Sequence, residues 1–95
     1  MPLFLEKIEE KDREFAQKIK SLLEFVNRDD TLPAKTRILI SLAIDAVQGK
    51  EEGVISIAAR AREMGVSDDE IAAVLRLVFL GSGFPGLATG TKAFE

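Results

Sequence analysis

The sequence contains no cysteine, histidine, tryptophan or tyrosine, and these absences exclude several kinds of chemistry. Without cysteine there is no disulfide, no thiol nucleophile and no soft metal site. Without histidine the chain lacks the usual general base near neutral pH and the usual zinc ligand. We therefore expect no metal and no cofactor.

The chain also lacks an excess of basic charge and a long hydrophobic run. It has 13 lysines and arginines against 16 aspartates and glutamates, for a net charge of −3. Nucleic-acid binding needs a basic face, so we expect no nucleic-acid partner. The run at residues 38–47 contains Asp45 and is about half of a membrane span, which needs roughly 18 residues. We expect a cytoplasmic protein that does not associate with membranes.

What is present indicates one folded domain over residues 1–95. The chain is 46% hydrophobic and 31% charged, which is too apolar for a disordered segment. It has only one asparagine, Asn27, and two glutamines, Gln17 and Gln48. Few amides together with many charges favour a thermophilic source.

Apolar residues recur three and four positions apart along the chain, which predicts an all-α protein of about five helices. The first predicted helix spans residues 3–27. Its apolar stripe is formed by Phe15, Ile19, Leu22, Leu23 and Val26. The second predicted helix spans residues 33–48. We expect Asp30 or Thr31 to cap it, with Pro33 in its first turn.

The later helices are bounded by glycine, serine and proline. Gly49 is expected to end the second helix in the left-handed conformation, and the third helix follows at residues 51–64. Ser67 and Glu70 have the spacing of a capping box, which predicts the start of a fourth helix. The segment GSGFPG at 81–86 is expected to break it, and residues 87–94 to form a last short helix.

Residues 38–47 place apolar side chains nearly all round the second helix. A helix that is apolar on all sides is buried on all sides, so we expect a second copy of the chain to cover it. Ser41 and Asp45 are the polar exceptions, four residues apart. We expect Ser41 to bond to a backbone carbonyl and Asp45 to pair with Arg60 or Arg62. A polar pair that lines a pocket is the alternative.

Three fragments in this order resemble a known family: PAKTRILISLAIDAVQG at 33–49, AARAREMGVSDDEI at 58–71 and GFPG at 83–86. Through them, residues 33–87 are similar to the carboxymuconolactone decarboxylase and alkylhydroperoxidase D-like (AhpD-like) superfamily. The resemblance implies an orthogonal helical bundle with a central antiparallel helix pair, which assembles as trimers, hexamers or other homo-oligomers. Residues 1–30, the N-terminal helix, carry no such signature.

The resemblance also implies where family-type chemistry would lie. Hydroperoxidase-like members carry Cys-x-x-Cys after the glycine turn, a histidine four residues later and a glutamate on the preceding helix. Decarboxylase-like members generally keep the histidine. The matching positions here are Lys50 and Gly53 for the cysteines, Ile57 for the histidine and Ile38 for the glutamate. We expect Ile38 and Ile57 to form a dry packed contact, and no family-type peroxidase or decarboxylase activity.

Three hypotheses on function remain. The favoured one is a catalytically silent homo-oligomer, a trimer or hexamer, with a binding or assembly role and an unidentified small-molecule ligand if it has one. The second is an enzyme with a relocated site, in which Lys50 is base or nucleophile and Asp45 or Glu52 is the acid. Its other available groups are Ser41, Glu51 and Arg60. The third is a subunit that pairs with a catalytic paralogue.

Overall fold

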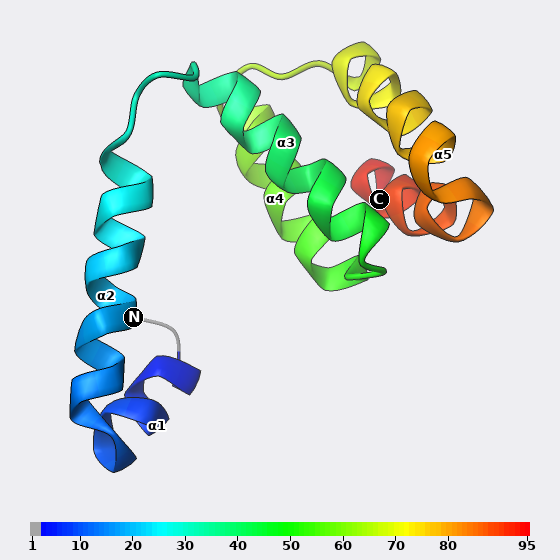
Figure 1. The fold of residues 1–95 in the computed structure, drawn as a ribbon. Coiled ribbons are helices and arrows are strands. Elements are labelled where there is room, and N and C mark those ends of the chain that lie inside the picture. Colours follow the sequence, from blue (N-terminus) through cyan, green and yellow to red (C-terminus); the bar gives the residue numbers. More distant parts are fainter. Residues whose placement is uncertain (1–2) are drawn as a thin grey trace. The chain divides into compact units, whose positions relative to one another are not determined.

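The computed structural model describes residues 3–95, and every regular element in that range is helical. The elements are α1 Leu3–Lys11, α2 Arg13–Arg28, α3 Ala34–Val47, α4 Glu51–Glu63, α5 Asp68–Gly90 and the 3-10 helix η1 Thr91–Phe94 (Figure 1). The prediction of an all-α chain with about five helices is confirmed. The chain forms two compact units, one within residues 1–31 and the other within residues 32–95.

The first unit contains two helices rather than the single helix predicted for residues 3–27. The Asp12 carboxylate accepts a hydrogen bond from the backbone N–H of Phe15 at 3.1 Å, which caps a new helix directly after α1. Lys20 Nζ on α2 lies 3.0 Å from Glu9 Oε2 on α1. The helical periodicity continues across the break, and the capping aspartate stands in a highly charged segment. The sequence pattern therefore did not predict the boundary between α1 and α2.

The predicted cap of α3 is also wrong. The carboxylate of Asp29, not of Asp30, accepts a hydrogen bond from the backbone N–H of Thr31 at 2.9 Å. The residue at the N-cap is Pro33, and no side chain caps the helix there. Proline fixes the backbone angle for helix entry, so α3 starts within one residue of the expected position without a side-chain cap.

The second unit is built on an antiparallel pair, α3 and α4, which run side by side in Figure 1. Helix α5 packs against α3, and η1 packs against α4 and α5. Gly49 and Gly65, with φ of 75° and 87°, end α3 and α4 as left-handed residues. The buried core comprises Leu42, Ala46, Val54, Ile57, Ala58, Ala61, Val66, Ile71, Leu75, Val78 and Ala93. Helix α4 and the first half of α5 supply most of it.

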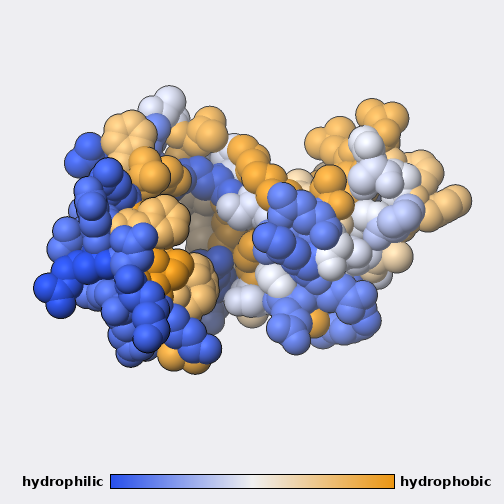
Figure 2. All heavy atoms as spheres, turned by 60° about the horizontal axis from the view of Figure 1, so that its bottom comes forward, coloured by the Kyte–Doolittle hydropathy of each residue, from blue (hydrophilic) through white to orange (hydrophobic). Residues whose placement is uncertain are grey.

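Helix α3 buries only part of its circumference within this chain. Leu42 and Ala46 are 0% exposed, whereas Ile44 and Val47 are 51% and 53% exposed. On α5, Leu77 is 70% exposed. Figure 2 shows hydrophobic surface gathered over the part of α5 around its bend, at the right of the view. The expectation that α3 is covered on all sides is not met by a single copy.

The break predicted within GSGFPG is confirmed: α5 consists of two helical segments that meet at a kink. Gly83 has φ 70° and ψ −156°, which no helix contains, and the helix resumes with Pro85 in its first turn. By length and composition alone, Asp68–Phe94 is apolar enough to cross a membrane. This corrects the expectation that no apolar stretch reaches that length. Buried core helices of soluble proteins pass the same test, and Ile71 and Leu75 belong to the core.

Candidate functional site

The turn between α3 and α4 holds the two positions where the family resemblance places cysteines. Its backbone is well connected: the N–H of Lys50 donates to the carbonyl of Asp45 at 2.9 Å, and the N–H of Val54 donates to the carbonyl of Lys50 at 3.0 Å. Lys50 is the N-cap residue of α4, and its exposed side chain makes no capping hydrogen bond. The turn is therefore held by main-chain bonds and by the left-handed glycine before it.

The positions where the resemblance places the glutamate and the histidine lie in apolar surroundings. Ile57 is 8% exposed and belongs to the core, and Ile38 packs against the same core cluster. Neither side chain can accept or donate a proton. The two positions therefore contribute apolar contact where a proton relay would need polar groups.

The carboxylate of Asp45 lies directly against Gly53, the second cysteine position. A Cβ atom added at position 53 would overlap Oδ2 of Asp45 and lie 3.1 Å from its Cγ. Asp45 is half-buried beside the first turn of α4, where the helix dipole favours a negative charge. Position 53 thus has no room for a side chain unless Asp45 moves.

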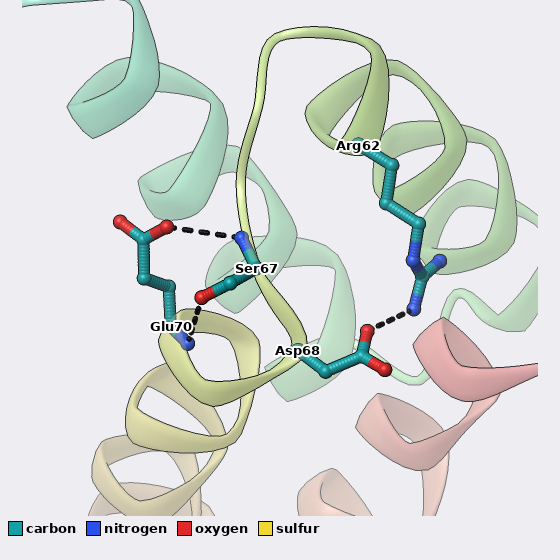
Figure 3. Close-up of polar contacts among 4 residues, drawn as sticks. All are labelled: Arg62, Ser67, Asp68 and Glu70. Carbon is teal, nitrogen blue, oxygen red and sulfur yellow. Dashed lines mark hydrogen bonds and ion pairs between the residues drawn. The ribbon is translucent and has the colours of Figure 1, made fainter.

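The predicted pairing of Asp45 with Arg60 or Arg62 is wrong. In the described residues, Arg62 instead pairs with Asp68, with 2.9 Å between Nη2 and Oδ1 (Figure 3). This ion pair joins the end of α4 to the start of α5. It is exposed at the aspartate, so its contribution to stability is small.

The predicted capping box is confirmed and lies beside this ion pair (Figure 3). The hydroxyl of Ser67 accepts from the N–H of Glu70 at 3.1 Å, and the Glu70 carboxylate accepts from the N–H of Ser67 at 2.9 Å. The hydrogen bond from the Ser67 backbone holds the pKa of Glu70 below its ordinary value of 4.5, with a smaller contribution from the charge of Lys35. Both side chains therefore cap the N-terminus of α5.

The candidate groups of a relocated site are only partly brought together. Asp45 and Lys50 both border Gly53, and Glu52 lies in the exposed first turn of α4. The Lys50 side chain is exposed, whereas a lysine nucleophile needs apolar surroundings. The Ser41 hydroxyl donates to the carbonyl of Arg37 at 3.1 Å, as expected for a serine inside a helix.

Two open apolar grooves lie in the second unit, and neither includes Asp45, Lys50 or Glu52. The first, the α3–α5 groove, has a volume of about 300 Å³ and is lined by Ala43, Ile44, Val47, Gln48, Leu77, Val78 and Gly81. The second, the α5–η1 groove, has a volume of about 370 Å³ and is lined by Ala72, Leu75, Arg76, Phe79, Leu87, Thr91 and Phe94. Gln48 is the polar residue of the first groove, while the second contains an arginine.

Sequence reasoning did not single out Arg76, although a signal was present. On a helix, residues three and four positions apart are neighbours. Around Arg76 these positions hold Ala72, Ala73, Phe79 and Leu80. A cation whose helical neighbours are all apolar is unusual on a solvated face, where acidic partners are common.

Among residues 3–95, no group of three or more aspartates or glutamates is placed to hold a metal ion. The acidic residues at the start of α5 cap and charge the helix terminus instead, which is the arrangement that the helix dipole favours.

Comparison with known proteins places the chain in a family. Residues 13–95 match the sequence model of the carboxymuconolactone decarboxylase family, so the match includes α2 as well as residues 33–87. Uncharacterized protein MJ1511 of Methanocaldococcus jannaschii is 30% identical over 80 residues, 84% of this chain and 75% of its own length. Uncharacterized protein MJ0742 of the same thermophilic archaeon is 33% identical over 89 residues, 93% of this chain and 86% of its own. Fold, motif order and these similarities agree, and the chain belongs to the carboxymuconolactone decarboxylase family.

Proposed function

We propose that this protein is a catalytically silent member of its family, a small helical homo-oligomer with a binding or assembly role. The observation that carries the proposal is the state of the family's site. Ile38 and Ile57 stand in or against the core, Lys50 is a solvated N-cap residue, and the Asp45 carboxylate fills the space beside Gly53. Without thiol, imidazole or relay acid, neither peroxide reduction nor family-type decarboxylation has a proton donor or nucleophile.

Activity assays on the purified, untagged protein test this part of the proposal. We expect no turnover of peroxide, of a disulfide or of a muconolactone-type carboxylate above a heat-inactivated sample. Turnover above that background, retained through a second purification step, would refute the absence of family-type activity. A positive control from a family member with the cysteines or the histidine shows that the assay is sensitive enough.

The assembly role is supported by the exposed apolar face along the α3–α5 groove. Ile44, Val47 and Leu77 are each more than half exposed in one copy. Monomeric proteins rarely leave large apolar patches open to water, and a patch of this kind usually marks an interface. We infer that a second copy covers this groove, in a trimer or hexamer.

Native mass spectrometry of the untagged protein tests the assembly. We expect a discrete oligomer that Leu77→Glu dissociates, because the substitution places a charge in the apolar groove without touching the core. Ile55→Glu on α4 is the matched control. Ile55 is also a large apolar side chain and is 41% exposed, but it lies outside the groove. A monomeric wild-type protein, or equal effects of both variants, would contradict the assignment of the interface.

One observation favours the alternative of an enzyme with a relocated site: Asp45 and Lys50 border the same glycine. In this alternative Lys50 is the base or nucleophile and a carboxylate is the acid. Titration of the Lys50 amine by NMR separates the two proposals, because a catalytic lysine titrates near neutral pH. An ordinary lysine titration removes this alternative.

The third hypothesis, a subunit that pairs with a catalytic paralogue, has its own test. The paralogous partner would be recovered together with the tagged protein from native lysate.

A further inference from the structure

The α5–η1 groove carries one positive charge in an otherwise apolar wall. No ion pair or hydrogen bond joins the Arg76 side chain to another residue in the part of the chain that the structure describes. The four residues three and four positions away on α5 are all apolar, so its own helix supplies no acid. An unpaired arginine above apolar side chains is a feature that folding alone does not require.

The groove is made by the bend of α5. Because Gly83 turns the chain, the second half of α5 and η1 return alongside the first half (Figure 1). The Leu75 side chain lies against the backbone of Gly90, where a Cβ atom would overlap its Cδ2 atom. This close approach brings the end of α5 against Leu75, which lines the groove. Phe79 from the first half and Phe94 from η1 stand in its walls.

The lining contains one further polar side chain, Thr91, and its hydroxyl proton is already engaged in a hydrogen bond. The Thr91 hydroxyl donates to the carbonyl of Ala88 at 2.7 Å. Among the lining side chains, Arg76 alone has donors to offer a bound molecule. A molecule bound in this groove would therefore contact apolar side chains and the N–H donors of one planar guanidinium group.

We propose that the α5–η1 groove binds a small carboxylate with an apolar body. The guanidinium group of Arg76 matches a carboxylate in shape and charge, and Phe79, Leu87 and Phe94 contact the apolar part. A volume of about 370 Å³ is at the small end of the range for ligand pockets. The inference deepens the binding role proposed above and names the ligand class of that role.

A second copy of the chain is a poorer occupant of this groove than of the α3–α5 groove. Covering Arg76 with an apolar surface would remove an unpaired charge from water, which is costly. The α3–α5 groove contains no charged side chain, so a second copy covers it without that cost. Phosphate fits less well than carboxylate, because one arginine supplies a single positive charge and no backbone cradle.

Binding of octanoate and octanamide to the full-length protein, followed by NMR, tests the proposal. The two probes have the same apolar chain and differ in charge. We expect octanoate to bind at least about tenfold more tightly than octanamide, and to shift the methyl signals of Leu75 and Leu87. In Arg76→Gln the octanoate affinity falls about tenfold and the octanamide affinity stays the same. Arg60→Gln, which removes an exposed arginine of α4 outside the groove, leaves both affinities unchanged.

Several results would overturn the inference. Equal affinity for the two probes, an unchanged octanoate affinity in Arg76→Gln, or shifts confined to Ile44 and Val47 would each do so. Absence of octanoate binding at millimolar concentration would also overturn it. The oligomer and the activity assays are measured on the same samples. Loss of the ligand proposal with an intact, inactive oligomer thus leaves the assembly role standing, whereas a monomer that binds octanoate removes the assembly role alone.

Discussion

Replacing Gly53 with alanine should not stabilise the protein, although the same change stabilises most helices. Gly53 lies in the first turn of α4, where alanine normally adds about 0.5–1 kcal/mol to the free energy of unfolding. Here the new methyl group would overlap Oδ2 of Asp45 and approach its Cγ to 3.1 Å. The Asp45 side chain is flexible and only half-buried, so it would turn aside and leave the first turn of α4, which costs about 0.3–1 kcal/mol. The two effects nearly cancel, and the net change in stability expected for Gly53→Ala is close to zero.

The same substitution should become stabilising when Asp45 is also changed. Asp45→Ala alone costs about 0.3–1 kcal/mol, because a negative charge leaves the first turn of α4. In that background Gly53→Ala meets no carboxylate and recovers the helix-forming gain of about 0.5–1 kcal/mol. The coupling between the two substitutions is therefore about 0.3–1 kcal/mol, at the low end of the range for residues in contact.

Urea denaturation followed by circular dichroism measures all four members of this cycle. The subunit concentration is held constant, because assembly makes apparent stability depend on concentration. If Gly53→Ala stabilises the protein equally with Asp45 and with Ala at position 45, the carboxylate has moved aside at no cost. That outcome would refute the reasoning. It would also reopen position 53 to a cysteine, which needs the same space as alanine and more.

Four further outcomes follow from the contacts described above. Ser67→Ala should cost about 1 kcal/mol through loss of the α5 cap. The pKa of Glu70 is lowered in the folded state, so its contribution is complete above its ordinary value of 4.5 and is lost as the pH falls through the lower folded value. The stability difference between wild type and Glu70→Gln, from urea midpoints across this range, should shrink in acid; a constant difference would contradict it. Ile57→His should cost about 2–5 kcal/mol, since it removes apolar burial and places a polar ring among apolar neighbours; a neutral result would mean that position 57 is wetter than its exposure indicates. Gly90→Ala should cost about 1–3 kcal/mol by collision with Leu75, read from thermal unfolding, and unchanged stability would contradict the close approach.

Much of the second unit could be predicted because its signals are local. A glycine after an apolar run ends a helix, and a serine three residues before a glutamate begins one. Both rules located Gly49 and the capping box of Ser67 correctly. The break within GSGFPG was located correctly for a similar reason, because Gly83, with φ 70°, interrupts the helix there. The break at Asp12 was missed because a capping aspartate in a charged segment looks like any other acid.

The candidate site was harder to predict, because its features depend on contacts between elements. The family resemblance places Lys50 and Gly53 at the cysteine positions, but the sequence does not show that the Asp45 carboxylate lies against position 53. The sequence suggested Arg60 or Arg62 as the partner of Asp45. In the structure Arg62 forms its ion pair with Asp68 at the start of α5. Arg76 became a candidate only once the bend of α5 brought η1 across from it. These contacts join different helical segments, and the periodicity within one helix carries no information on them.

Two of the positions that the resemblance assigns to the family's active groups hold isoleucines that stabilise the fold. A buried histidine or glutamate needs a polar partner, and burial without one costs free energy. Isoleucine at position 57 instead contributes apolar burial, about 1.5–3 kcal/mol for a fully buried side chain. A side chain at position 53 would in turn displace the Asp45 carboxylate. Restoring the relay would therefore remove buried apolar contact at position 57 and move Asp45 from the start of α4, whereas the exposed Lys50 could change freely. The binding and assembly roles proposed above accordingly lie away from that turn, on the apolar face of α3 and α5 and around Arg76.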